Sequence, residues 1–397
     1  MRILQIVPSI SLVYGGPSQM VLGLSAALAR AGVDVTVLTT DSNGDTGQAP
    51  LDVPLDRAVE QDGYRLRYFR CSPFRRYKFS IDLLRWLYQN AKEFDLAHIH
   101  ALFSPVSSGA ASVARSRHLP YILRPLGTLD PADLRKKKQL KQIYATLLEK
   151  PNIAGAAAIH FTSTEEAKVS ERFGVSTRDL VIPLGVIPPQ PPLTKGGQIP
   201  PQGNGGDLPL VLFMSRIDPK KGLNLLLPAL ENLLASGFKF HFVLAGGNPQ
   251  DPDYEAKIKA QIQASPLLEH TTITGFVTGD RKTSLLQQAD LFVLPSYYEN
   301  FGIAVAEAMA SGIPVVISDQ VYIWQDVQQA DAGWVAALNV ESLTYMLKIA
   351  LTESNEERQR RGERARVYAL EHYSWDAIAQ QTIGAYKEIL SAKPVRS

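Results

Sequence analysis

The sequence predicts an α/β protein with two domains, each built on a mostly parallel, doubly wound sheet with helices on both faces. Its 397 residues exceed what one ordinary hydrophobic core accommodates. Short apolar runs alternate with helical patterns in both halves, which is typical of crossover units. A Pro- and Gly-rich segment separates the halves. The predicted organisation is a domain at 1–186, a linker insert at 187–207, a second domain at 208–372 and a closing helix at 373–397.

The predicted strands are short runs of apolar and β-branched residues. In the first half they are residues 2–7, 34–40, 96–100, 120–125 and 157–163. In the second half they are residues 210–215, 240–246, 271–277, 291–296 and 313–318. Apolar residues at helical spacing lie between most of them, for example Met20, Leu24 and Leu28. Two parallel sheets follow from this alternation.

The predicted linker is rich in Pro and Gly, whereas the predicted closing helix carries regularly spaced apolar residues. In residues 187–207, 11 of 21 positions are Pro or Gly, so the segment cannot bury enough apolar surface to offset the entropy of ordering it. We interpret it as a flexible insert between domains. The last segment places Trp375, Ile378, Ile383 and Tyr386 at roughly helical spacing, which predicts an amphipathic helix.

Composition excludes several classes of protein. The formal net charge of +2 gives no global reason to expect a nucleic-acid partner. A single cysteine, Cys71, cannot form an internal disulfide, which fits a reducing cytoplasm. The first residues read as a strand rather than a signal peptide because Gln5, Pro8 and Ser9 interrupt the apolar run. No run approaches the roughly 20 apolar residues that cross a bilayer, so we expect a cytoplasmic protein.

Ligands of parallel sheets bind at the carboxyl ends of the strands, so the turns that follow strands are the candidate sites. After the first strand, Gly15 and Gly16 precede a helix that begins near Pro17, and they allow close backbone approach to a phosphate or form a plain tight turn. After the first strand of the second half come Arg216 and Lys221. Two cations there suit a diphosphate, the alternative being a solvated basic loop.

Residues 295–316 carry two glutamates, Glu299 and Glu307, on either side of Gly302. The glycine places Glu299 in the loop before a helix and Glu307 slightly over one turn inside it. The free N–H groups at the helix start would then face an anion. One extended ligand satisfies this pattern: a sugar at Glu299, a diphosphate at the helix start with Arg216 and Lys221, and ribose hydroxyls at Glu307. That ligand is a nucleotide-sugar.

The segments "SRIDPKKGL" and "LPSYYENFGIAVAEAMASGIPVV" resemble the C-terminal half of group 1, family 4 retaining glycosyltransferases. The segments "YGGP", "AHIHALFSP" and "RPLGTLDP" look like the same family, so the resemblance covers nearly the whole chain outside the linker. It implies two Rossmann-like domains facing across a cleft, the GT-B architecture. It also implies a closing helix that crosses back to the first domain.

The resemblance implies transfer of a sugar from a nucleotide-diphosphate sugar to a saccharide or lipid-linked acceptor, with retention at the anomeric carbon. The donor would bind mainly to the C-terminal domain and the acceptor to the N-terminal one. The implied catalytic residues are Arg216, Lys221 and Glu299. The implied donor-binding residues are Gly15, Gly16, Gly246, Val277, Asn300, Phe301, Gly302, Ile303 and Glu307.

One departure from the family concerns the first domain. Relatives often place a histidine near the reacting sugar where this chain has Leu126. The nearby candidates for contact with the acceptor or the sugar are His98, His100, Arg124 and Gly127, although a strand-end histidine is as often a structural group. The sequence leaves the identity of any acid or base open.

Two other functions remain open at this point. A retaining glycoside hydrolase would use the two glutamates as acid and nucleophile, but it gives no purpose to the cations and the helix start. A nucleotide-sugar-binding protein without catalysis is the other alternative, and Leu126 makes it conceivable. We expect no metal or other cofactor, and we interpret Asp251 and Asp253 as a loop and a helix cap.

A basic stretch at residues 135–150 combines lysines with leucines at helical spacing. It predicts either a solvated helix face, which we favour, or a helix that contacts an anionic membrane or a lipid-phosphate acceptor. The membrane alternative is favoured slightly by further basic charge at Arg65, Arg67, Arg70, Arg75, Arg76 and Lys78.

Overall fold

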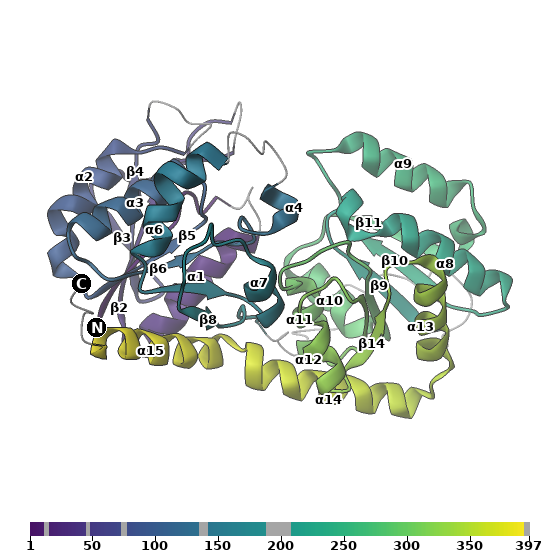
Figure 1. The fold of residues 1–397 in the computed structure, drawn as a ribbon. Coiled ribbons are helices and arrows are strands. Elements are labelled where there is room, and N and C mark those ends of the chain that lie inside the picture. Colours follow the sequence, from purple (N-terminus) through teal and green to yellow (C-terminus); the bar gives the residue numbers. More distant parts are fainter. Residues whose placement is uncertain (12–15, 45–47, 73–77, 135–141, 188–207, 393–397) are drawn as a thin grey trace. The chain divides into compact units, whose positions relative to one another are not determined.

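The computed structural model describes residues 1–11, 16–44, 48–72, 78–134, 142–187 and 208–392. The chain forms two compact units (Figure 1). The first comprises Met1–Gly185 and Trp375–Ser397, and the second comprises Val186–Ser374. Most of the predicted linker, residues 188–207, lies outside the described residues.

The first unit is built on an eight-stranded sheet with the strand order β3-β4-β2-β1-β5-β6-β7-β8. All neighbouring strands are parallel except β3 and β4. The strands are β1 (Arg2–Ile6), β2 (Asp34–Thr40), β3 (Ala58–Gln61), β4 (Tyr64–Phe69), β5 (Leu96–His100), β6 (Tyr121–Arg124), β7 (Ala158–Phe161) and β8 (Asp179–Val181). The helices are α1 (Gly16–Arg30), α2 (Ile81–Asn90), η3 (Ala91–Glu93), α3 (Pro105–Ser116), α4 (Pro131–Leu134), η4 (Ala145–Glu149), α6 (Lys150–Ala154), α7 (Thr164–Val169) and α15 (Trp375–Ser391).

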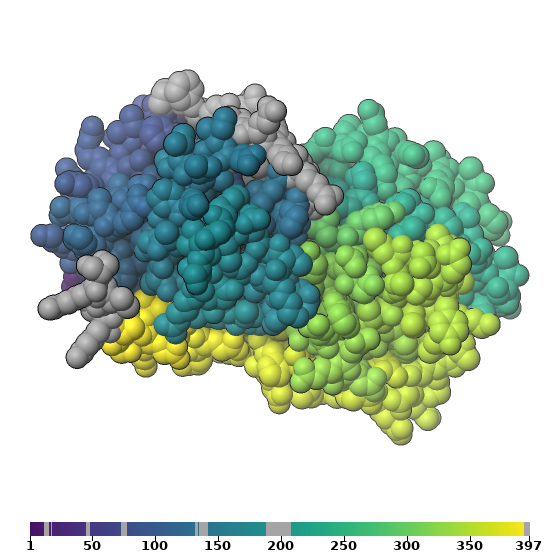
Figure 2. All heavy atoms as spheres, in the orientation of Figure 1, coloured from purple at the N-terminus to yellow at the C-terminus, as the bar shows by residue number. Residues whose placement is uncertain are grey.

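Helix α15 completes the first unit although it is the last helix of the chain. It packs against α1, and the ring of Trp375 fills a notch that two glycines leave open. A Cβ atom would lie 2.4 Å from this ring at Gly23 and 2.2 Å from it at Gly185, so no larger residue fits at either position. The other side of α15 lies at the molecular surface, shown in yellow in Figure 2. A buried face and an exposed face are what the amphipathic spacing predicts.

The second unit is built on a six-stranded parallel sheet with the strand order β11-β10-β9-β12-β13-β14. Its strands are β9 (Leu210–Met214), β10 (His241–Ala245), β11 (Thr271–Gly275), β12 (Leu291–Leu294), β13 (Val315–Ser318) and β14 (Gly333–Ala336). Its helices are η5 (Pro219–Lys221), α8 (Leu223–Ala235), α9 (Pro252–Gln263), η6 (Pro266–His270), α10 (Gly279–Gln288), α11 (Ile303–Ala310), α12 (Trp324–Gln329), α13 (Val340–Thr352) and α14 (Asn355–Tyr373). The predicted fold class is confirmed.

Each predicted run contains a strand, but four strands were not predicted. Strands β3, β8 and β14 are short, and β4 alternates apolar residues with arginines. In β4, Arg65 pairs with Asp34 at 2.5 Å, and the guanidinium of Arg67 lies 5.5 Å from the ring centroid of Trp86. These two arginines therefore contact their own unit, which removes them as support for a membrane-binding surface.

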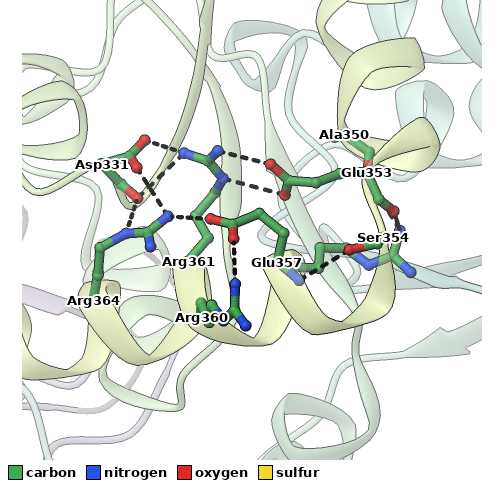
Figure 3. Close-up of polar contacts among 9 residues, drawn as sticks. Asp331, Ala350, Glu353, Ser354, Glu357, Arg360, Arg361 and Arg364 are labelled. Carbon is green, nitrogen blue, oxygen red and sulfur yellow. Dashed lines mark hydrogen bonds and ion pairs between the residues drawn. The ribbon is translucent and has the colours of Figure 1, made fainter.

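An ion-pair network fixes helix α14 to the rest of the second unit (Figure 3). Arg361 bonds Glu353 at 2.7 Å and pairs with Asp331. Arg364 pairs with Asp331 at 2.9 Å and with Glu357 at 3.0 Å. The hydrogen bond from Arg364 also lowers the pKa of the Glu357 carboxyl. Because several members of this network are partly exposed, we expect each pair to add little stability.

None of the helices in the described ranges is both long and apolar enough to cross a membrane.

Candidate functional site

The sheet of the second unit has a topological switch point between β9 and β12. These strands are neighbours, and the chain runs outward from β9 through β10 to β11 and from β12 through β13 to β14. A crevice forms at such a reversal because the two loops that follow the strands turn to opposite sides. Here the loops are residues 215–222 after β9 and residues 295–302 after β12. This is where a ligand of such a sheet is expected.

The two loops contact each other directly. The Tyr297 N–H donates to the carbonyl of Lys220 at 2.7 Å. Gly222 has a φ of 74°, and a Cβ atom there would lie 1.9 Å from the carbonyl oxygen of Pro295. Only glycine satisfies both conditions, so this residue sets the spacing of the loops.

The loop after β9 carries both predicted cations, in different surroundings. Lys221 is buried, and its ammonium pairs with the carboxylate of Glu299 from the other loop. Arg216 is half exposed and has only long contacts, 3.7 Å to Asp218 and 3.5 Å to Gln250. Its guanidinium can therefore reorient toward an anionic ligand without losing a short hydrogen bond or ion pair.

The loop after β12 holds Glu299 through its backbone. The Glu299 N–H donates to Gln320 at 3.0 Å, and its carbonyl accepts from Tyr322 at 2.9 Å. Helix α11 then begins after Gly302, whose φ of 79° reverses the chain and which provides no side-chain cap. The first N–H groups of the helix, beginning with that of Ile303, thus have no capping side chain, as a phosphate-binding helix start requires.

Two further members of the predicted set lie in this loop. The side chain of Asn300 is partly buried, and that of Phe301 is buried against Tyr373, with ring centroids 5.1 Å apart. Phe301 can therefore offer a ligand only its backbone. Its ring instead fixes the start of α11 to the end of α14.

Glu307 is not isolated within α11. Its carboxylate pairs at 2.6 Å with Lys282, which comes from the first turn of α10. The sequence analysis missed Lys282, because nothing in its local pattern indicates a partner 25 residues away. The pair holds Glu307 in place and leaves one carboxylate oxygen for another contact.

Two predicted contacts with the nucleotide follow β10 and β11. A Cβ atom at Gly246 would lie 1.9 Å from the carbonyl oxygen of Ser215, so glycine lets the β10 turn approach the β9 loop. Val277 is buried, but the preceding Phe276 exposes 76% of its surface. An exposed aromatic ring can stack on a flat ring of a ligand, and the local sequence pattern does not single out Phe276.

In the first unit, His98 and His100 do not lie at the surface, as contact with a ligand requires. Both point to the sheet face that α15 covers, and they are 1% and 0% exposed. The Tyr386 hydroxyl bonds His98 Nδ1 at 2.8 Å, and His98 Nε2 bonds His160 at 3.1 Å. His100 Nε2 bonds Gln5 at 2.7 Å. Strand alternation therefore turns both histidines into the interior, where they have structural partners, and their contact with a ligand stays a prediction.

The carbonyl of Ile182, at one end of this buried network, fixes the direction of the hydrogen bonds between the histidines and Tyr386. His160 Nε2 must donate to the carbonyl of Ile182, 2.8 Å away, so its Nδ1 accepts from His98 and His98 Nδ1 accepts from Tyr386. The Tyr386 oxygen in turn accepts from the Gln5 amide at 3.0 Å. Burial, together with the charge of Arg124, holds the pKa of His98 and of His160 well below 6.5, so both rings are neutral at neutral pH.

Arg124 and Gly127 lie at the end of β6. The Arg124 side chain is 2% exposed, and its Nε and Nη2 atoms have no hydrogen-bond partner among the described residues. Burial lowers the pKa of Arg124 to about 10, which leaves it charged at neutral pH. Leu126 and Gly127 both have positive φ, 56° and 79°, and the Gly127 N–H donates to Glu166 at 3.2 Å. The positive φ of Leu126, a residue with a side chain, strains the turn that follows the buried Arg124.

The other predicted positions lie at the starts of two helices or outside the described residues. Gly16 is the first residue of α1, whereas Gly15 and the lysines of residues 135–141 lie outside the described residues. Asp251 caps α9 by accepting from the Tyr254 N–H at 3.1 Å, and Asp253 lies in the first turn of that helix rather than in a loop. The described residues contain no cluster of three or more His, Cys, Asp or Glu side chains that could hold a metal ion.

Comparison with known proteins identifies both halves of the chain. The "Glycosyl transferase 4-like domain" matches residues 15–185, and "Glycosyl transferases group 1" matches residues 198–368. An uncharacterized glycosyltransferase of Methanocaldococcus jannaschii is 32% identical over 46% of this chain, which spans about half (45%) of that relative. The phosphatidyl-myo-inositol mannosyltransferase of Mycobacterium leprae is 24% identical over 99% of this chain and 98% of its own length.

A solved structure shows the same fold. The structure of Anabaena HepE in complex with UDP and glucose is 18% identical in sequence and has a TM-score of 0.73. The match covers 98% of this chain and 100% of that protein. This likeness, together with the two parallel sheets, shows the GT-B architecture.

Proposed function

The chain belongs to the group 1 glycosyl transferases, and from this premise we propose that it transfers a sugar from a nucleotide-diphosphate sugar to a saccharide or lipid-linked acceptor with retention of configuration. One observation carries the proposal: the switch point of the second unit brings together Arg216, the Lys221–Glu299 pair and the uncapped start of α11. Two cations and a helix start suit a diphosphate. A carboxylate beside them suits the hydroxyl groups of a sugar.

Each side chain has a role in this proposal. Arg216 and Lys221 neutralise the diphosphate, and the N–H groups of Gly302 and Ile303 bind its oxygens. Glu299 orients the transferred sugar, since its backbone is fixed by the loop before α12. The carboxylate of Glu307, held by Lys282, accepts from the ribose hydroxyls.

The proposed reaction needs no side-chain base. The acceptor oxygen attacks the anomeric carbon from the face that the diphosphate leaves, and the bond from carbon to the phosphate oxygen breaks with its electron pair staying on the phosphate. A phosphate oxygen takes the acceptor proton. The protein then has to orient the sugar and stabilise charge on the phosphate, which Arg216, Lys221 and α11 can do. Leu126 at the position of the relatives' histidine is compatible with such a step.

The retaining-hydrolase alternative is weakened by the pairing of its two carboxylates. A hydrolase needs one carboxyl group that carries a proton and one that attacks the sugar. Glu299 instead pairs with Lys221 and Glu307 with Lys282, so each faces its own cation. Gly127, in the turn after β6, remains our candidate for contact with the acceptor, whereas the side chain of Arg124 is as buried as those of His98 and His100.

The test of the function is product formation from defined donors. Thermal-shift screening of nucleoside diphosphates and their sugars should find one that stabilises the fold, by about 2.7 kcal/mol at 100 times its dissociation constant. Transfer to saccharide acceptors is then followed with that donor, and nuclear magnetic resonance gives the anomeric configuration of the product. A retained configuration supports the proposal. Binding without any product would favour a binding protein.

Glu307→Ala should weaken the binding of the free nucleoside diphosphate tenfold or more, whereas Glu299→Ala should leave that affinity nearly unchanged and impair transfer. The reason is that Glu307 meets the ribose, with hydrogen bonds to a charged group worth about 1.5–3 kcal/mol, while Glu299 meets only the sugar. Calorimetry with the nucleoside diphosphate measures both. Lys282→Ala is the control for loss of the ion pair alone. Equal loss of affinity in both glutamate variants would refute the assignment.

We propose that transfer needs no metal ion, because Arg216, Lys221 and the start of α11 supply the positive charge that a metal would give to the leaving diphosphate. Activity should therefore survive a strong chelator with less than a twofold change in rate. The measurement is initial transfer rate with and without chelator. Complete loss, restored by added magnesium or manganese, would show that the charge on the diphosphate is balanced in another way.

A further inference from the structure

The second unit contains an open cavity that the proposed reaction does not use. Its volume is about 510 Å³, and its lining comes from η5, the first turn of α8, one side of α9 and the loop after β12. The lining residues are Pro219, Lys220, Asn224, Tyr254, Lys257 and Tyr297. They include two cations, two tyrosines and an amide, and no carboxylate.

The two lysines give the cavity its charge. Lys220 and Lys257 have no ion-pair partner in the part of the chain that the structure describes. Lys220 is adjacent to Lys221, but the two diverge: Lys221 pairs with Glu299 inside the unit, whereas Lys220 lines the cavity beside the ring of Tyr298, 5.1 Å from its centroid. Two unpaired ammonium groups facing one cavity favour an anionic ligand.

The polar groups of the cavity are suited to hydroxyls. The Tyr297 hydroxyl accepts from the Asn224 amide at 2.7 Å, so its own hydrogen is left to donate. The Tyr254 hydroxyl is buried and has no hydrogen-bond partner among the described residues. A buried hydroxyl without a partner is costly unless a ligand or water satisfies it. Tyrosine also presents an apolar ring face beside its hydroxyl, a combination suited to a sugar.

The first turn of α8 also favours an anionic ligand in the cavity. The helix begins after Gly222 without a side-chain cap, and Asn224 in its first turn lines the cavity. Its first N–H groups therefore add partial positive charge on that side.

We propose that this cavity is a second binding site, which takes a carbohydrate bearing a phosphate or a carboxylate group. Lys220 and Lys257 bind the acidic group, and the hydroxyls of Tyr254 and Tyr297 with the Asn224 amide bind the sugar. The cavity shares the loops after β9 and β12 with the proposed donor site, but its lining includes none of Arg216, Lys221 and Glu299, so the proposal does not rest on the proposed function. It would give the protein an affinity for acidic saccharides, either as part of a growing acceptor or as a free sugar phosphate.

The test uses calorimetry on the full chain with four probes: glucose 6-phosphate, glucuronate, glucose and inorganic phosphate. The first two should bind at least tenfold more tightly than glucose and than inorganic phosphate. Lys257→Ala should weaken them about tenfold, and Tyr254→Phe severalfold. Lys257 is exposed, so its removal leaves the fold intact.

Two controls separate this site from the rest of the protein. Lys259→Ala removes a lysine of the same helix that pairs with Glu255 at 2.6 Å and does not line the cavity, so it should change nothing. Binding of UDP should be the same in Lys257→Ala as in the parent chain. Absence of binding by either acidic sugar, or equal binding to the parent and Lys257→Ala, would overturn the proposal. Competition between UDP and glucose 6-phosphate, with both weakened in Lys257→Ala, would make the cavity a part of the donor site and overturn it as well.

Discussion

Lys221→Ala is expected to lower turnover at saturating donor by a hundredfold or more. In our proposal its ammonium stabilises charge that builds up on the leaving phosphate, and loss of one such oriented contact costs on the order of 10² to 10³ in rate. The variant also leaves Glu299 without its cation, in a loop whose backbone is fixed. Arg216→Ala should have a similar effect, although Arg216 is more exposed and has no short contact to lose in the free protein.

Single-turnover transfer measures this prediction, with the configuration of the product read by nuclear magnetic resonance. Lys259→Ala is the matched surface control and should keep the parent rate. If Lys221 and Glu299 act as a unit, the double variant should be little slower than Lys221→Ala, because effects within one pair are not additive. His98→Ala and His100→Ala should lose far less turnover per folded molecule. An inverted product, or a histidine variant as slow as the arginine one, would point to a side-chain base.

Tyr386→Ala is expected to destabilise the first unit by about 3–5 kcal/mol, the range for removing a large buried ring. The ring is fully buried, and its hydroxyl joins Gln5 to His98. Tyr386→Phe keeps the ring and removes only the hydroxyl, so it should cost about 1–3 kcal/mol from the polar groups left unpaired. Urea denaturation followed by circular dichroism measures both. Equal stability of the phenylalanine variant and the parent would mean that the hydroxyl network contributes nothing.

The same network makes stability depend on pH. The folded-state pKa of each buried histidine lies well below the unfolded value near 6.5, so unfolding takes up protons in acid. Stability from this source is fully present above pH 6.5 and is lost as the pH falls below it. The urea midpoint of the parent should therefore drop between pH 7.5 and pH 5.5. A midpoint that stays constant over this range would contradict the neutral network.

The sequence predicted those parts of the site that are local. Arg216 and Lys221 follow a strand, and Gly302 separates Glu299 from the helix of Glu307, so their positions relative to the sheet edge follow from the chain itself. The partners of these groups are not local. The pairing of Glu307 with Lys282 depends on how α10 and α11 pack, and no spacing rule contains that information.

The histidines show the same limit more clearly. A strand-end position predicts that His98 and His100 lie near the carboxyl edge, which is correct. It does not say which face of the sheet they occupy. It also does not say that α15 covers that face, since Tyr386, the partner of His98, lies 288 residues further along the chain. The face alone decides between a ligand contact and a buried structural group. Strand β4 was not predicted for a related reason. Its arginines have partners, Asp34 and Trp86, that are distant in the sequence and meet them only in the folded sheet.

The discontinuity of the first unit has a consequence for the order in which a ribosome completes the protein. Domains usually fold in the order of synthesis. Here the second unit, Val186–Ser374, is continuous and is synthesised before α15, whereas the first unit must wait for Trp375 and Tyr386. Until then the groove between Gly23 and Gly185 stays unfilled and the Gln5 amide lacks its partner. A chain that stops before residue 375 would therefore contain all of the second unit and a first unit without its last helix.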